Sequence, residues 1–190
     1  MQPFTDPAPP PTNDDEARAR DMIDAWTNVK TQLVVEEVRN GGMLGGPLFR
    51  KTFGAPPPIV PRHFVALYRT RESDLRVGAY IHYMAFRDVA WLCGGLCVEP
   101  AFYATAPDEV GACVKRMGGL GEIVLRDTFA RLTDRCAIFG YCGDARQWQH
   151  DLNIGFVPAG PPRMLVRWTK AIADADREAL IEEVRAMGAF

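Results

Sequence analysis

The sequence lacks any apolar run approaching the roughly 20 residues that a transmembrane helix needs. Its N-terminus also lacks the basic and apolar regions of a secretion signal. Neither sign of charge dominates, because 22 Lys and Arg residues stand against 24 Asp and Glu residues, for a formal net charge of −2. This balance gives no indication of a nucleic-acid-binding surface. We therefore expect a cytoplasmic protein that binds neither a membrane nor nucleic acid.

Patterns of metal ligands are missing as well. The three histidines lie far apart, and the five cysteines include no C-x-x-C pair, so no metal site is expected. The cysteines are odd in number and most lie in apolar runs, which favours buried free thiols in a reducing compartment. The remaining composition is ordinary for a globular protein: 190 residues, 47% hydrophobic and 24% charged, enough for one domain with one core.

Composition divides the chain into an arm and a domain. Residues 1–13 hold five prolines and few apolar side chains, which predicts a flexible arm that cannot offset its ordering entropy by burial. The domain, at 14–190, is predicted to begin with a helix at 14–40, because apolar residues recur there at helical spacing. Its β-branched tail makes a strand the competing interpretation. Glycine and proline predict a long loop at 41–62.

The core of the domain is expected at about 63–168. β-branched and aromatic runs predict three successive strands at 63–68, 76–86 and 89–98, and the short turns between them imply antiparallel pairing. Helices and further strands follow, and a C-terminal helix is predicted at 174–187. Antiparallel strands followed by a strand–helix–strand crossover favour an α/β (α+β) fold, with a mixed, mostly antiparallel sheet flanked by helices.

The segment with the clearest chemical meaning is a glycine-rich junction that opens a helix at Glu122. It reads Arg116-Met117-Gly118-Gly119-Leu120-Gly121. Glycines let backbone approach a ligand closely, and the free N–H groups at a helix start attract phosphate oxygens. A Gly-Gly pair is equally typical of the place where one helix ends and another begins. The segment alone therefore leaves both interpretations open.

Four short motifs, taken in order, resemble those of the GCN5-related N-acetyltransferase (GNAT) family. Arg116-x-x-Gly119-x-Gly121 is similar to the Q/R-x-x-G-x-G/A motif that binds the pyrophosphate of acetyl-coenzyme A in that family. Cys97-Val98-Glu99-Pro100 resembles the end of the family's fourth strand, 137–142 its fifth strand, and Asn153-Ile154-Gly155-Phe156 the end of its last crossover helix. The resemblance covers about 63–168 and implies a GNAT-like fold, with extra helices at both ends.

The resemblance also implies a ligand and its place. The sheet would splay after the fourth strand, and the pantetheine arm of acetyl-coenzyme A would bind there to backbone around Cys97 and Val98. The pyrophosphate would lie on the glycine-rich loop, and an unidentified amine would attack the thioester. The loop residues implied in cofactor binding are Arg116, Gly118, Gly119, Leu120, Gly121 and Glu122.

Acetyl transfer would need a base for the amine and an acid for the departing thiolate. The candidate bases are Glu99 and His150, with His82 as a further candidate; each also has a structural interpretation, as a solvated carboxylate, an exposed helix residue and a core histidine. Asp151 stands where many family members carry a tyrosine that protonates the thiolate. An ionised carboxylate is a poor proton donor unless burial raises its pKa. The segment 101–115 is a second departure, because the family has only a few residues there.

Two other functions stay open. The two departures and the proline-rich stretches favour a GNAT-like domain without catalysis, serving as a structural or interaction protein with a protein partner or as a homo-oligomer. Compact phage-encoded proteins with GNAT-like cores are similar in style, which would place the chain in a virion. The third hypothesis is a thiol enzyme with Cys142 as nucleophile beside His150, although no oxyanion motif accompanies the pair.

Overall fold

The computed structural model describes residues 21, 23, 24, 26–143, 145–160, 163–188 and 190. The arm expected at 1–13 and the first part of the helix expected at 14–40, up to residue 20, lie outside these residues. Within the described part of the chain, no helix combines the length and the apolar character needed to cross a membrane.

A seven-stranded sheet organises the chain, in the order β1-β2-β3-β4-β5-β7-β6. Its strands are β1 (Leu33–Glu37), β2 (Arg62–Arg69), β3 (Leu75–Phe86), β4 (Ala90–Val98), β5 (Ala137–Tyr141), β6 (Val157–Gly160) and β7 (Met164–Trp168). Every neighbouring pair is antiparallel except β4 and β5, which are joined by a helical crossover and run parallel. The predicted mixed, mostly antiparallel sheet is confirmed.

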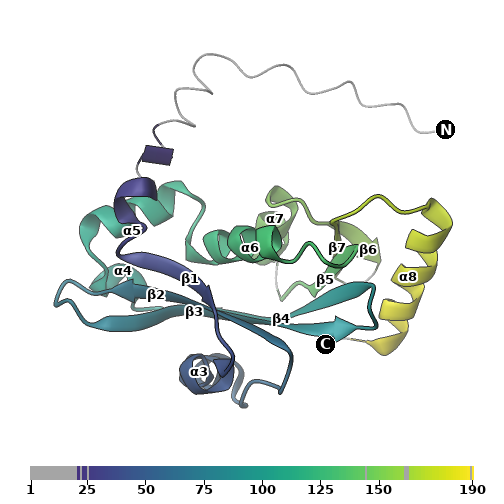
Figure 1. Cartoon of the computed structure of the whole chain (residues 1–190), viewed down its shortest axis with the longest axis horizontal. Coiled ribbons are helices and arrows are strands. Elements are labelled where there is room, and N and C mark those ends of the chain that lie inside the picture. Colours follow the sequence, from purple (N-terminus) through teal and green to yellow (C-terminus); the bar gives the residue numbers. More distant parts are fainter. Residues whose placement is uncertain (1–20, 22, 25, 144, 161–162, 189) are drawn as a thin grey trace.

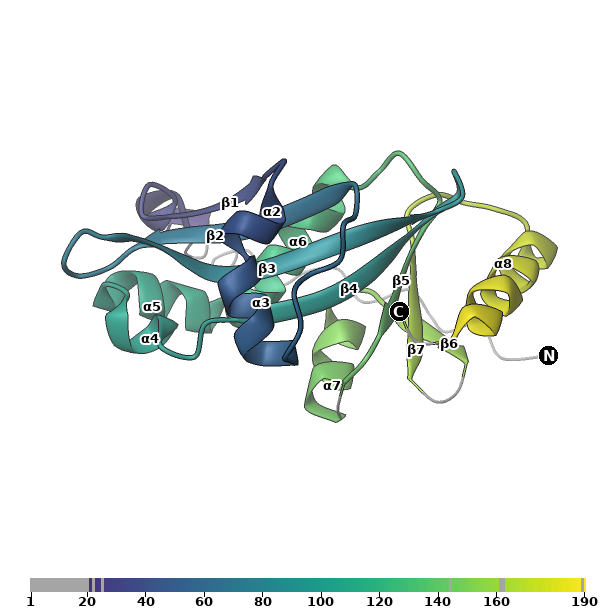
Figure 2. The same cartoon turned by 90° about the horizontal axis from the view of Figure 1, so that it is seen from below.

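Helices cover both faces of the sheet. They are α2 (Gly41–Leu44), α3 (Gly46–Phe53), α4 (Phe102–Thr105), α5 (Asp108–Arg116), α6 (Leu120–Arg131), α7 (Ala145–Asn153) and α8 (Asp174–Met187). Figure 1 shows α5, α6 and α7 on one face and α3 on the other. Figure 2 shows α2 and α3 in front of β2, β3 and β4, with α8 beyond the β5–β7–β6 end. The sheet is thus the middle layer of three.

The alternation of β3 explains how one strand serves both layers. Ile81 and Tyr83 belong to the large apolar cluster under α5 and α6, whereas Tyr80 and His82 face α3 and contact Phe49. All four side chains are buried, with exposed fractions of 6% or less. Because β3 is covered on both sides, it reads as a nearly continuous apolar run rather than an alternating one.

The N-terminal helix predicted at 14–40 is wrong at its C-terminal end. Residues 26–29 are helical, but 33–37 form β1, the edge strand paired with β2. Leu33 and Val35 are buried and Val34 is exposed, which is the period of a strand. The competing interpretation as a strand is correct here, because pairing with β2 gives β-branched residues the extended backbone that they favour.

The prediction of a loop at 41–62 is also wrong in its first half, where α2 and α3 lie. A side chain on Gly41 would overlap His63, and one on Gly45 would overlap the ring of Tyr80. Pro47 falls in the first turn of α3, where a missing N–H is tolerated. The glycines therefore reflect two short helices pressed directly on the sheet, which composition alone cannot distinguish from a loop.

His82 ties the stability of this fold to pH. Burial, with a smaller contribution from the neighbouring His63, lowers the pKa of His82 to about 4. The unfolded chain takes up this proton near the ordinary pKa of 6.5. The neutral histidine therefore carries no cost above pH 6.5, and the free energy of unfolding decreases as the pH falls from 6.5 toward 4.

We expect His82→Gln to reduce the loss of unfolding free energy between pH 7 and pH 4.5 by about 2 kcal/mol, because the variant carries no group that titrates there. Urea unfolding of both proteins at the two pH values measures this difference. Ile59→Gln, at a fully exposed residue without a titratable group, should leave the loss unchanged. An identical pH dependence in wild type and His82→Gln would contradict the assignment.

Candidate active site

The sheet opens between β4 and β5. Only Ala90–Cys93 at the start of β4 pair with β5. β4 continues to Val98 with β3 as its partner, so the last part of β4 presents a backbone edge to the gap. This is the splay that the GNAT resemblance implied.

A β-bulge lies at the point of opening. The register between β3 and β4 shifts between Tyr80 and His82. On β4, Gly95 has a φ of 60°, in the left-handed region, and a side chain there would overlap Phe49. A bulge bends the strand that carries it, so β4 can follow β3 while leaving β5.

Two adjoining hollows occupy the gap and share Leu96, Leu125 and Gln147 in their walls. The first, which we call the loop arm, lies beside the start of α6 and is also lined by Val98, Gly118, Gly119, Gly121, Glu122, His150 and Ile154. The second, which we call the aromatic arm, reaches α3 and is also lined by Thr52, Phe53, Cys93, Gly95, Gly140, Tyr141, Gly143, Asp151, Phe156 and Phe190. A long ligand could therefore enter at α6 and reach the α3 side of the sheet.

The loop arm offers fewer free amides than the sequence predicted. Gly118 and Gly119 donate their N–H groups to carbonyls at the end of α5, at 3.3 and 2.9 Å, and the Leu120 N–H faces the phenol oxygen of Tyr103. Gly121 and Glu122, in the first turn of α6, have no backbone acceptor among the described residues. Their two N–H groups are the part of the helix start that is open to an anion.

The side chain of Glu122 lies in the same notch. It folds back over Gly118, where a Cβ atom would overlap its carboxylate, and it is only 13% exposed. Arg126 donates to it at 2.7 and 2.9 Å, and His150 Nδ1 lies 3.9 Å from its other oxygen. A carboxylate at the third position of a helix is stabilised by the helix dipole. An anionic ligand at these amides must displace this side chain.

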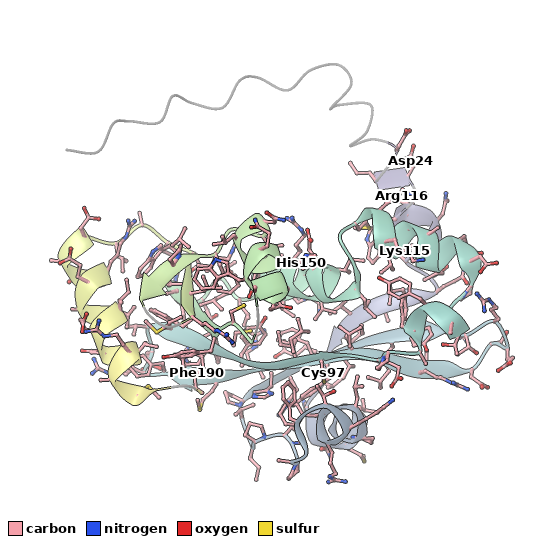
Figure 3. All side chains as sticks on the ribbon, turned by 180° about the vertical axis from the view of Figure 1, so that it is seen from behind. Asp24, Cys97, Lys115, Arg116, His150 and Phe190 are labelled. Carbon is pink, nitrogen blue, oxygen red and sulfur yellow. The ribbon has the colours of Figure 1, made fainter. Side chains whose placement is uncertain are left out.

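Of the other residues predicted to bind the cofactor, some line the cleft and some do not. Arg116 is exposed at the end of α5 and lines neither arm among the described residues. Figure 3 shows it beside Lys115, on the same face of the sheet as His150. Val98 lines the loop arm, whereas the side chain of Cys97 is buried on the α3 face and only its backbone lies near the opening.

Glu99 lies outside both arms. Its carboxylate accepts hydrogen bonds from Lys51 Nζ at 3.1 Å and from the N–H of Ala101 at 3.2 Å. Burial would raise the pKa of Glu99, but these two donors outweigh burial and lower it. A carboxylate held in this way is a weaker base than a free one. The surroundings of Glu99 fit a structural carboxylate at the end of a strand rather than a catalytic base.

His150 and Asp151 point into different arms because consecutive residues of a helix face different directions. His150 lines the loop arm and its side chain is 39% exposed. Asp151 lines the aromatic arm, is 8% exposed, and accepts a hydrogen bond from Gln147 Nε2 at 2.7 Å. Burial raises the pKa of Asp151, against the opposing effects of Gln147, Cys142 and His150. This is the condition under which a carboxyl group can donate a proton.

The thiol of Cys142 is 4% exposed and forms a hydrogen bond with Asp151. A reactive cysteine needs an accessible thiolate with a positively charged or basic neighbour. The immediate partner here is a carboxyl group, so the geometry does not resemble a thiol–imidazole pair. Among the described residues, no three His, Cys, Asp or Glu side chains are grouped as a metal site would require. The absence of a metal stays a prediction.

Sequence reasoning missed most of the aromatic arm. Thr52 and Phe53 lie in a segment predicted as a loop, and Phe190 is the last residue of the sequence. Gln147, which bridges the arms and bonds Asp151, carried no motif. Only the helical spacing of Gln147 and Asp151, four residues apart, hinted that the two side chains would meet.

Comparison with known proteins finds similarity in structure alone: no family model and no curated protein matches the sequence. The KacTA–DNA complex is 13% identical, with 80% of this chain and 99% of that chain covered and a TM-score of 0.49. An acetyltransferase of the GNAT family from Staphylococcus aureus Mu50 is 10% identical, with 72% and 100% covered and a TM-score of 0.45. AtaTR bound with AcCoA is 12% identical, with 79% and 98% covered and a TM-score of 0.40.

The burial of Asp151 has a measurable cost. Because its pKa is raised in the folded protein, the unfolded chain loses this proton first, and stability falls as the pH rises from the ordinary pKa of 3.8 through the raised one. We expect Asp151→Asn to raise the free energy of unfolding at pH 7.5, on the scale of about 1 kcal/mol, and to have less effect at pH 4. Urea unfolding at both pH values measures this. Asp176→Asn, which removes an exposed carboxylate, should give no such gain. A larger gain at pH 4 than at pH 7.5 for Asp151→Asn would contradict a pKa raised by burial.

Proposed function

We propose that the protein is an N-acetyltransferase that moves an acetyl group from acetyl-coenzyme A to an amine. The observation that carries this proposal is the opening between β4 and β5, which begins at the amides of Gly121 and Glu122 and passes through the sheet to α3. The resemblance of the motifs at 97–100, 116–121 and 153–156 to GNAT motifs supports the same ligand.

The two ends of the cleft suit the two ends of acetyl-coenzyme A. The diphosphate would bind the two free N–H groups at the start of α6, where the helix dipole favours an anion. The pantetheine arm carries two amides, which would pair with the backbone edge of β4 at 96–98 as an added strand does. The thioester would then lie at the junction of the arms, beside Leu96 and Gln147.

Transfer forms a bond between the amine nitrogen and the acetyl carbon and breaks the bond between that carbon and sulfur. The net reaction moves one proton from nitrogen to sulfur. The carboxyl group of Asp151, in the aromatic arm, would donate its proton to the departing thiolate and then accept the proton released by nitrogen. One group would thus account for both proton transfers. Burial, which raises the pKa of Asp151, supports its role as the donor.

Glu99 and His150 are then secondary candidates. His150 lies beside Glu122 in the loop arm, so it would act on the diphosphate end rather than on the amine. Glu99 could act only on an acceptor that reaches past Lys51. Neither residue lines the aromatic arm.

A domain that binds a partner without catalysis is the second candidate. It is favoured by the carboxylate of Glu122 in the notch and by the internal pairing of the Gly118 and Gly119 amides. Both features oppose an anion at the loop. Binding of acetyl-coenzyme A therefore separates the two functions.

Acetyl-coenzyme A should bind the full chain and stabilise it, by about 2.7 kcal/mol when its concentration is 100 times Kd. Calorimetry and thermal unfolding measure this. Gly121→Leu should abolish binding, because a Cβ atom at this position already lies 3.4 Å from Leu96 and a longer side chain fills the loop arm. Ala112→Leu, on the exposed side of α5, is the matched control and should bind normally. Wild type that does not bind the cofactor at millimolar concentration would leave only the non-catalytic domain.

Glu122→Gln should strengthen binding of acetyl-coenzyme A by about tenfold, which corresponds to about 1.4 kcal/mol. The diphosphate would then displace a neutral amide from the notch instead of a carboxylate held by Arg126. Calorimetry at low salt gives the clearest measurement, because salt screens the repulsion. Glu178→Gln, an exposed residue of α8, should have no effect. Weaker binding by Glu122→Gln would show that the carboxylate is part of the binding site.

A further inference from the structure

The aromatic arm ends in a wall of rings contributed by segments far apart in the sequence. Phe53 comes from the end of α3, Tyr141 from the end of β5, and Phe156 follows α7. Phe190 packs edge-on against Tyr141, with ring centroids 5.1 Å apart. Figure 3 shows Phe190 on the opposite side of the sheet from His150. The far end of the cleft is therefore an aromatic site on the α3 side.

One ring of this wall is open to solvent. Phe53 is 49% exposed, although it stacks against Phe49, whose exposed fraction is 7%, with centroids 4.6 Å apart. Phe156, deeper in the arm, is 4% exposed and packs against Phe129. A half-exposed phenylalanine at the mouth of a deep arm gives an apolar molecule a surface to cover.

The polar groups of the arm are few and neutral in character. Thr52 already donates its hydroxyl to the carbonyl of Leu48 at 3.0 Å. Burial raises the pKa of the Cys93 thiol to about 12, so it carries no charge. Asp151 is the one side-chain carboxyl group in the described lining, and its hydrogen bond with Gln147 is part of the reaction site proposed above.

The charges next to the mouth are basic. Arg50 and Lys51 occupy the last turn of α3, directly before Thr52 and Phe53. Lys51 is paired with the carboxylate of Glu99 at 3.1 Å. A molecule with several ammonium groups would meet these cations, and Asp151 is the only side-chain carboxyl group in the described lining of the arm that could pair with its charges.

We infer that the acceptor is a primary amine on an aromatic or aliphatic body, such as a 2-phenylethylamine, and is neither a polyamine nor a lysine side chain of a basic peptide. This inference rests on the proposed acetyl transfer. The body of the amine would pack against Phe53 and Tyr141, while its nitrogen reaches the junction of the arms near Asp151. The cofactor would fill the loop arm, so the acceptor must enter from the α3 side.

The test measures release of coenzyme A by the full chain with acetyl-coenzyme A and one of four amines: 2-phenylethylamine, hexylamine, spermidine and a lysine-containing basic peptide. The two amines that carry one amino group on an apolar body should have kcat/KM values at least about tenfold above those of spermidine and the basic peptide. Phe53→Ala should raise KM for 2-phenylethylamine about tenfold. Its Kd for acetyl-coenzyme A should stay unchanged, because Phe53 does not line the loop arm. Ile59→Ala, at a fully exposed apolar residue outside both arms, should change neither value.

The possible failures are distinguishable. Faster turnover of spermidine or of the peptide would overturn the inferred acceptor and leave acetyl transfer intact. Tight binding of acetyl-coenzyme A without turnover of any of the four amines would also overturn the inferred acceptor. Absence of cofactor binding in calorimetry would overturn acetyl transfer itself, and the inferred acceptor with it. An unchanged KM in Phe53→Ala would overturn the inferred packing of the acceptor against the aromatic mouth.

Discussion

The structure depends on the unequal pairing of β4 with its two neighbouring strands. It pairs with β3 to its end, but with β5 over only four residues. A strand in the middle of a sheet normally satisfies its backbone groups on both sides, because an unpaired buried amide or carbonyl is costly. β4 avoids that cost by facing a cleft. The bulge at Gly95 and the departure of β5 therefore create a backbone edge inside the sheet that can pair with a ligand's amides.

Helix α6 places the second half of the site. Its residues Leu120, Ile123 and Val124 are buried in the apolar cluster that also holds Ile81 and Tyr83 of β3. This packing fixes the first turn of the helix at the opening, whichever residues precede it. The start of a helix carries partial positive charge, and in the free protein the side chain of Glu122 satisfies it. A ligand would thus replace an internal anion, and the free energy of binding would be the difference between the two.

The opposite face shows how a small part of the chain acquires a role that its composition hides. Glycines at 41 and 45 remove the side chains that would keep α2 and α3 off the sheet. The pair of helices then brings Thr52 and Phe53 to the far mouth of the cleft. Asp151 reaches the same space from α7, where burial raises the pKa of its carboxyl group.

The sequence by itself determined the elements whose pattern is local. β2 to β4, the helix at 174–187 and the glycine-rich start of α6 follow from apolar periodicity and turn residues. Tertiary structure decided what depends on distant partners: β1 is a strand because β2 pairs with it, and the Leu120 amide is used because Tyr103 lies beside it. Local patterns specify backbone shape, but burial and the pairing of individual donors depend on contacts between residues far apart in the chain. For that reason the motif at 116–121 was visible in the sequence, while the aromatic arm and the position of Glu122 in the notch were not.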